Sequence, residues 1–226
     1  PTLTNGNVHG IIVLNVYNER LLRLLAETQI PKVFLDTSSL VAPDELNGDL
    51  LLMESRTSVR RITCHLLEQG RTLPGFIGDI SYAQSNRERY EGFCQALADA
   101  GKKVDSSLCL TTPLGIDTYR EEIDTFLSSL SRMPDAFVCA SDYVACILMQ
   151  LLEKRGLRVP EDVAVSGFDN NTEDLLAEHL TTVQVFNEEL GARLALQILY
   201  RIKYPNTPHE ITYLGTNVLY RDSTGD

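Results

Sequence analysis

Short apolar runs alternate with amphipathic segments along the chain, and each run predicts a buried strand. Strands that are apolar at nearly every position are typical of parallel sheets covered on both faces. The predicted strands are residues 10–14, 32–36, 74–78, 108–110, 136–140 and 163–168, with two short strands near 211–214 and 217–220.

Helical spacing of the remaining apolar residues predicts helices between these strands. Residues 57–69, for example, place Val59, Ile62 and Leu66 on one stripe, and Gly70 suits the residue just past the helix end. Strands alternating with helices indicate repeated βαβ units around a parallel sheet. The other predicted helices are one capped by Asn18, residues 86–100, one opened by a Thr118–Glu121 capping box, one running from Ser141 to near Gly156, and residues 187–203.

Composition and charge narrow the class of protein. Hydrophobic residues make up 43% and charged residues 23% of the 226 residues, which is typical of a globular protein. The net charge is −11 and there is no basic run, so we expect these residues not to bind nucleic acid. No stretch approaches the roughly 18 apolar residues that span a bilayer. We therefore expect no membrane partner.

The five cysteines are odd in number and include no CxxC pair. Cys109, Cys139 and Cys146 lie in apolar runs, so we interpret them as small core residues of a reduced compartment. The four histidines share no ligand spacing, and GxSxG, P-loop and HExxH motifs are absent from the sequence. We therefore expect no metal, no cofactor and no catalytic residues.

Polar residues follow several of the predicted strands, where ligands bind in open α/β sheets. Such residues are also ordinary turn and helix-cap residues, so each alone is an ambiguous sign of a ligand site. They are Asp36, Asp79, Ser141, Asp142, Asp169 and Asn170.

Arg89 is a further candidate, because a cation near the beginning of a helix opposes the helix dipole. A guanidinium beside the strand ends suits a hydroxylated or anionic ligand. The alternative is a solvated helix face, on which Glu88 and Glu91 balance its charge.

Four ordered motifs resemble those of the lactose-repressor (LacI/GalR) family. The most specific is AFVCASDYVACILMQLLEKRGLRVPEDVAVSGFDN, residues 136–170. It is similar to the family's strand, Asn/Ser-Asp, helix, G-x-x-V-P-x-D-V/I, strand and G-F/Y-D. The others are SNRERYEGFCQAL (85–97), LTTVQVFNEELG (180–191) and LYRDSTG (219–225).

This resemblance implies a periplasmic-binding-protein-like α/β fold of two lobes, each a parallel sheet flanked by helices, with three crossovers between them. The crossovers are expected near residues 53–54, 182–185 and 214–216. The N-terminal lobe would comprise residues 1–53 and 184–214, and the C-terminal lobe residues 54–183 and 215–226.

The family pattern also implies which residues bind the ligand in the cleft. Arg89 and Asp169 match its ligand-binding positions, and Ser141 and Asp142 match a strand-end pair in which Asn is common at the first position. Asp36 and Met53 match positions of the first lobe.

By this resemblance the chain is the effector-sensing core of a bacterial, cytoplasmic transcription repressor, not an enzyme. We expect it to bind a sugar, polyol or nucleoside, to form a homodimer, and to reach DNA only through a headpiece absent from this chain. The start of the first lobe is also expected to be missing. Two alternatives remain open: an extracytoplasmic solute-binding protein of a sugar transporter, and an α/β enzyme.

Two departures from the family pattern lie mainly outside the implied ligand contacts. Gly70-Arg71-Thr72 stands where Gly-His-Arg is usual. The preceding segment, MESRTSVRR, lacks the small residues that the family usually has there.

Overall fold

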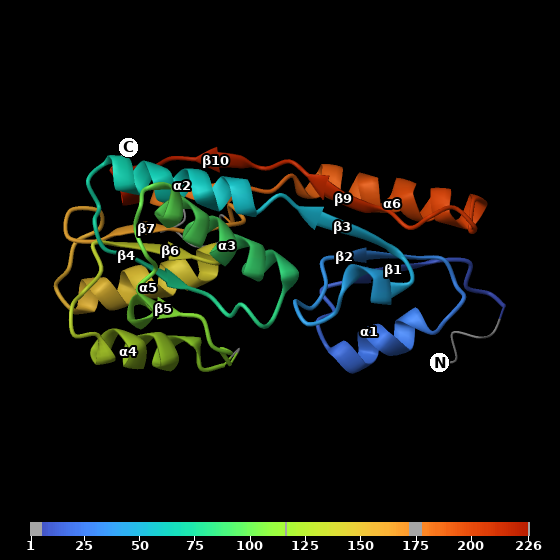
Figure 1. Ribbon diagram of the computed structural model, residues 1–226, viewed down its shortest axis with the longest axis horizontal. Coiled ribbons are helices and arrows are strands. Elements are labelled where there is room, and N and C mark those ends of the chain that lie inside the picture. Colours follow the sequence, from blue (N-terminus) through green and yellow to red (C-terminus); the bar gives the residue numbers. More distant parts are fainter. Residues whose placement is uncertain (1–5, 116, 172–177, 226) are drawn as a thin grey trace. The chain divides into compact units, whose positions relative to one another are not determined.

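A computed structural model describes residues 6–115, 117–171 and 178–225 of the chain (Figure 1). Its residues divide into two compact units, which are described separately. Unit 1 comprises residues 1–54, 82–85 and 186–215, and unit 2 comprises residues 55–81, 86–185 and 216–226. Residues 82–85, placed with the C-terminal lobe from the sequence, group with unit 1.

Unit 1 is built on a four-stranded parallel sheet with the strand order β1-β2-β3-β9. Its helices α1 (Glu19–Ala26) and α6 (Asn187–Lys203) lie on opposite faces of the sheet (Figure 1). Asn18 caps α1 as predicted, by accepting the backbone N–H of Leu21 over 3.0 Å. The strands are β1 (Ile11–Leu14), β2 (Lys32–Leu35), β3 (Asp49–Met53) and β9 (Ile211–Leu214).

The period of two along the strands divides the apolar residues of unit 1 between the two faces. Leu22 of α1 is fully buried in a cluster with Val13, Phe34 and Leu50. On the α6 side, Leu190, Leu194 and Ile198 are buried as predicted, whereas Ile202, expected to face inward, is 37% exposed. Both sheet faces are thus covered, as the near-continuous apolar strands require.

Unit 2 is built on a second parallel sheet, with the strand order β5-β4-β6-β7. Helices α2 (Arg56–Glu68) and α3 (Gln84–Asp99) lie on one side of it, and α4 (Tyr119–Ser129) and α5 (Asp142–Lys154) on the other (Figure 1). The strands are β4 (Pro74–Ile77), β5 (Cys109–Leu110), β6 (Ala136–Cys139) and β7 (Ala164–Ser166).

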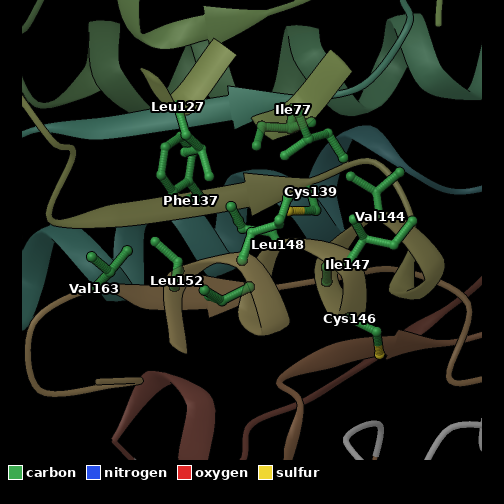
Figure 2. Close-up of a cluster of buried hydrophobic side chains, with 14 of the residues drawn as sticks. Ile77, Leu127, Phe137, Cys139, Val144, Cys146, Ile147, Leu148, Leu152 and Val163 are labelled. Atoms are coloured by element: carbon green, nitrogen blue, oxygen red, sulfur yellow. The ribbon is translucent and has the colours of Figure 1, made fainter. Parts of the chain in front are cut away.

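Adjacent residues of β4 point to opposite sides of this sheet. The ring of Phe76 contacts that of Phe93 in α3, at 5.6 Å between centroids. Ile77 instead joins the cluster that packs α4 and α5 on the sheet, which includes Leu127 and Leu148 (Figure 2). The same cluster holds Cys139 and Cys146 (Figure 2), and all five cysteines are free.

An antiparallel pair of strands completes unit 2. It consists of β8 (Thr182–Gln184) and β10 (Asn217–Leu219). The segment after β10 links this pair of strands to the parallel sheet. The Ser223 hydroxyl donates to the carbonyl of Val165 in β7 over 2.6 Å and accepts the N–H of Thr181, the residue before β8, over 2.8 Å. The chain-end motif therefore has a structural role.

The predicted α/β class, with parallel sheets flanked by helices, is confirmed. Two strands were not predicted as strands, β3 and β8. The predicted Thr118–Glu121 capping box is wrong: the Thr118 hydroxyl bonds to Glu122, which also accepts the Gly115 N–H over 3.1 Å. Within the described part of the chain, no helix has the length and apolar character to cross a membrane.

Candidate functional site

Four of the predicted site residues lie in unit 2, three of them just after neighbouring strands and one on a helix. Ser141 and Asp142 follow β6, Asp169 follows β7, and Arg89 is on α3, the helix after β4. Because β4, β6 and β7 are adjacent and parallel, their carboxyl ends share one edge of the sheet. The sheet order therefore brings these four positions to the same edge.

The Arg89 guanidinium is held on three sides. Its Nη1 donates to the Ala140 carbonyl and, over 3.4 Å, to the side chain of Asn86. Its Cζ lies 3.6 Å from the centroid of the Phe168 ring, a cation–π arrangement. Its Nη2 lies 3.5 Å from Oδ1 of Asp169. Arg89 is therefore a buried, positioned cation, and the alternative of a solvated helix face is wrong.

Two features indicate that the Arg89 guanidinium does not use all of its hydrogen-bond donors within the described part of the protein. The Nε of Arg89 is buried without a hydrogen-bond partner among the residues that the structure describes. The 3.5 Å separation from Asp169 is also long for a charge-assisted hydrogen bond. Buried donors in folded proteins are normally satisfied. The arrangement therefore suits a ligand that supplies an acceptor.

Asp169 has an uncommon backbone conformation and an accessible carboxylate. Its φ is +111°, at a cost of about 1–3 kcal/mol for a residue other than glycine. The backbone N–H donates to the Val183 carbonyl over 3.0 Å, which fixes the turn. The side chain is 42% exposed, and Arg89 is its polar partner in the described part of the chain. Partial desolvation raises the pKa of this carboxyl, and the Arg89 charge opposes the shift.

Asp142 is buried and fully engaged with its neighbours. Its carboxylate accepts the Thr182 hydroxyl over 2.5 Å and the Asn171 N–H over 2.8 Å. Burial raises its pKa to about 6, the two hydrogen bonds lower it, and the charge of Asp169 raises it further. This carboxylate therefore locks the beginning of α5 to the loop after β7 and to β8.

Ser141 is the N-cap of α5, with its hydroxyl accepting the Val144 N–H over 3.3 Å. Asp79 has a similar turn role, since Oδ1 accepts the N–H and the hydroxyl of Ser81. The interpretation as a cap or turn residue therefore holds for Ser141 and Asp79, whereas the Asp142 carboxylate bonds to Asn171 and Thr182, far along the chain. Ser141 is half-buried, so its side chain can be contacted by a ligand while it caps α5.

The other two candidates, Asp36 and Met53, belong to unit 1. Asp36 follows β2 with a φ of +59°, and Met53 is the last residue of β3. The Asp36 carboxylate accepts the Thr37 N–H (2.8 Å), the Ser85 N–H (3.3 Å) and hydroxyl (2.6 Å), and the Tyr17 hydroxyl (3.4 Å). A ligand contact by either residue stays a prediction.

Three residues that contact the candidate site were not predicted from the sequence. Phe168 supports Arg89 and Thr182 holds Asp142. Arg221 donates to Asn170 (2.8 Å) and to the Leu180 carbonyl (3.0 Å), next to Asp169. All three lie in motifs that resemble the lactose-repressor family, Phe168 in residues 136–170, Thr182 in residues 180–191 and Arg221 in residues 219–225.

The described residues contain no group of three His, Cys, Asp or Glu side chains placed to hold a metal ion. The site itself offers one guanidinium donor, Arg89, beside one carboxylate acceptor, Asp169.

Comparison with known proteins identifies the family of the chain. A family model described as a periplasmic binding protein-like domain matches residues 63–224. The transcriptional repressor PurR of Aliivibrio fischeri (strain MJ11) is 29% identical over 225 residues, covering 98% of this chain and 66% of the repressor. The regulator DegA of Bacillus subtilis (strain 168) is 31% identical over 170 residues, covering 74% of this chain and 48% of DegA.

A solved complex of the transcriptional regulator CelR with cellobiose is 27% identical with a TM-score of 0.85, and the match covers 97% of this chain and 67% of that one. The chain thus spans about two thirds or less of the length of these relatives. The chain belongs to the periplasmic binding protein-like family, and the resemblance to the lactose-repressor family is confirmed.

Proposed function

We propose that this chain is the effector-sensing part of a LacI-type transcription repressor, and that it binds a small hydroxylated ligand at Arg89 and Asp169. Ser141 and Asp142 complete the proposed site in unit 2, and Asp36 and Met53 are the proposed contacts of unit 1. The regulators PurR, DegA and CelR support this class of function over a transporter-linked solute-binding protein or an enzyme.

The juxtaposition of Arg89 and Asp169 carries the proposal. A guanidinium only donates hydrogen bonds and an ionised carboxylate only accepts them. A hydroxyl group does both, so one hydroxyl, or two neighbouring ones, satisfies Arg89 and Asp169 together. The Asp169 side chain is 42% exposed, and the Arg89 Nη2 lies 3.5 Å from its Oδ1, so a donor and an acceptor stand side by side at this position.

A sugar, polyol or nucleoside fits this pair of partners. A site that hydrogen-bonds hydroxyls strongly rejects analogues lacking them, because its own buried groups would then be unpaired. The similar regulator CelR was solved with cellobiose, a hydroxyl-rich sugar, which favours this ligand class.

Signal transfer is proposed to follow a population shift. The ligand favours one conformation of the protein by its differential affinity, and a homodimer passes that change to helix-turn-helix segments outside these residues. The net charge of −11 agrees with DNA contacts lying elsewhere. The setting proposed for this function is the bacterial cytoplasm.

A ligand screen followed by calorimetry tests the proposal. The chain is screened for thermal stabilisation by D-glucose, D-ribose, D-cellobiose, mannitol and guanosine, since a ligand that binds the native state raises its melting temperature. Arg89→Ala and Asp169→Asn should each weaken binding of the stabilising compound at least about 30-fold, as expected for about 2 kcal/mol.

Arg155→Ala is the matched control. Arg155 also pairs with an aspartate in unit 2, Asp124, over 2.8 Å, but away from the strand ends. Its removal should leave the affinity unchanged. Binding that is equally strong in the Arg89 and Asp169 variants, or stabilisation by none of the compounds, would contradict the proposed function.

A further inference from the structure

We infer that Tyr17 and Tyr82 form an aromatic stacking surface of unit 1 for the ring of a carbohydrate, with Asp36 as the residue that positions it. The inference rests on the proposed function and narrows its ligand class from hydroxylated compounds in general to cyclic sugars. Neither tyrosine matches a motif singled out in the sequence.

The two rings lie together at the strand ends of unit 1. Their centroids are 4.2 Å apart at an interplanar angle of 44°. Tyr17 follows β1, and its hydroxyl donates to Asp36 Oδ2 over 3.4 Å and to Asn15 Oδ1 over 3.5 Å. Tyr82 is 46% exposed and Tyr17 is half-buried. An aromatic pair with one exposed and one half-buried ring is therefore flanked by polar groups at the edge where α/β sheets bind ligands.

The chain holds Tyr82 in place through the residues that follow it. Ala83 forms an antiparallel bridge with Ser38, and the Gln84 N–H donates to the Thr37 carbonyl over 2.8 Å. The Ser85 hydroxyl donates to Asp36 over 2.6 Å. These contacts fasten the segment carrying Tyr82 to the loop after β2.

The backbone at both strand ends is in the left-handed region. Asn15 has a φ of +54° and Asp36 a φ of +59°. Conformations of this kind are uncommon outside glycine and concentrate at functional sites. They occur here at the two residues whose side chains accept the Tyr17 hydroxyl.

Asp36 acts through these neighbours. A carboxylate has about four lone-pair sites, and Asp36 receives four donors, from Thr37, from Ser85 twice and from Tyr17. All four of these donors belong to unit 1. The carboxylate fixes the loop and orients the Tyr17 ring.

A sugar ring fits such a surface. A pyranose has hydroxyls at its edge and an apolar face of C–H groups, while a tyrosine offers an apolar face with a polar tip. An acyclic polyol has the same hydroxyls but no flat apolar face. The surface therefore favours glucose-type rings over mannitol.

A second tyrosine pair of unit 1 provides a matched control. Tyr200 and Tyr204 lie four residues apart at the end of α6, with ring centroids 5.1 Å apart. Tyr204 is 44% exposed, much like Tyr82. This pair lies on a helix surface, away from the strand ends.

Tryptophan fluorescence tests the inference directly, because the chain has no tryptophan. Tyr82→Trp and Tyr204→Trp each introduce one reporter. Titration with D-glucose, D-ribose, D-cellobiose, mannitol and guanosine should change the emission of Tyr82→Trp with a cyclic sugar and leave Tyr204→Trp unchanged. Tyr17→Ala and Tyr82→Ala should each weaken that sugar about tenfold in calorimetry.

The remaining variants separate stacking from positioning. Tyr17→Phe, which keeps the ring but loses the hydroxyl, should weaken the sugar less than Tyr17→Ala. Asp36→Asn should lower the affinity in the tyrosine-containing chain and have less than a twofold effect when Tyr17 is already alanine.

The outcomes distinguish the two proposals. Binding that depends on Arg89 but is within twofold of normal in Tyr17→Ala and Tyr82→Ala overturns this inference and leaves the proposed function standing. A larger response of Tyr82→Trp to mannitol or guanosine than to every sugar also overturns it. Absence of binding by all five compounds contradicts both.

Discussion

The hydroxyl of Thr182 donates a 2.5 Å hydrogen bond to the carboxylate of Asp142, and this bond joins the first turn of α5 to strand β8. The second carboxylate oxygen accepts the Asn171 N–H over 2.8 Å. Two residues before Asp169, the ideal Cβ position of Gly167 lies 2.2 Å from the same carboxylate. Asp142 therefore supports the loop that carries Asp169.

The pKa of Asp142 predicts a pH dependence of stability. Burial raises that pKa to about 6 in the folded protein, against 3.8 ordinarily. Between these values the folded state holds the proton more tightly than the unfolded state, so the free energy of unfolding falls as pH rises from about 4 to 6. The loss is roughly 3 kcal/mol.

Urea unfolding of the original chain and of Asp142→Asn, at several pH values, measures this contribution. Asparagine does not titrate, so the difference between the two chains removes the effect of other carboxyl groups. The original chain should lose stability relative to the variant from pH 4 to pH 6, and the difference should be constant above pH 7. Parallel curves across this range would show that the pKa of Asp142 is ordinary.

Two helical glycines are predicted to respond oppositely to alanine. The ideal Cβ position of Gly92 in α3 lies 2.2 Å from the Arg56 carbonyl oxygen of α2, whereas that of Gly191 in α6 has no atom within 4 Å among the described residues. Gly191→Ala should therefore stabilise the chain by about 0.5–1 kcal/mol through helix propensity. Gly92→Ala should destabilise it by about 1–3 kcal/mol through overpacking. Chemical denaturation measures both, and stabilisation by Gly92→Ala would mean that α2 and α3 are less closely packed than described.

The sequence predicted the elements that carry their own pattern. The apolar stripe along residues 187–203 predicted helix α6 with the bounds that the structure has, Asn187–Lys203. Strand β9 was likewise predicted at its observed position, Ile211–Leu214. The sequence did not predict β8, because two of its three residues, Thr182 and Gln184, are polar and the strand forms no apolar run. It did not predict β3 either, since the strand begins at the buried Asp49, whose partner Arg201 is 152 residues away.

The candidate site, like the fold, was predicted only in part from the sequence. Strand-end position and resemblance together pointed to Arg89 and Asp169, and the structure brings them to 3.5 Å. No local signal marked Phe168 as the support of Arg89, because an apolar residue at the end of a strand is ordinarily core. Tyr82 was missed for another reason: its partner Tyr17 lies on a different strand end, and sequence spacing does not reveal that contact.

Unit 1 is predicted to depend on the buried ion pair of Asp49 and Arg201. The carboxylate receives Nε of Arg201 over 3.1 Å and Nη2 over 2.5 Å, together with the Gln197 side chain over 2.7 Å. Removing one partner leaves an uncompensated buried charge, so Arg201→Ala should cost about 3–5 kcal/mol of stability. Arg158→Ala, which breaks an exposed pair with Asp162, is the control and should have no measurable effect. Equal unfolding midpoints for the two variants would contradict the predicted dependence.

The last prediction concerns Phe168, which lies under the Arg89 guanidinium at 3.6 Å from Cζ to the ring centroid. Phe168→Leu keeps an apolar side chain but removes the aromatic face. A desolvated cation–π contact contributes about 2 kcal/mol, so the affinity for the stabilising ligand should fall roughly 10- to 30-fold. The stability loss should be about 1–3 kcal/mol, since the ring is fully buried.

A double-mutant cycle separates support of Arg89 from a general effect on the fold. If Phe168 acts by holding the guanidinium, Phe168→Leu should change the affinity less than twofold in a chain that already carries Arg89→Ala. Val165→Ala, a truncation of another fully buried residue of unit 2, controls for loss of packing and should leave the affinity near that of the original chain. Additive losses in the double variant would assign Phe168 to packing alone and leave Arg89 positioned by the Ala140 carbonyl and Asn86.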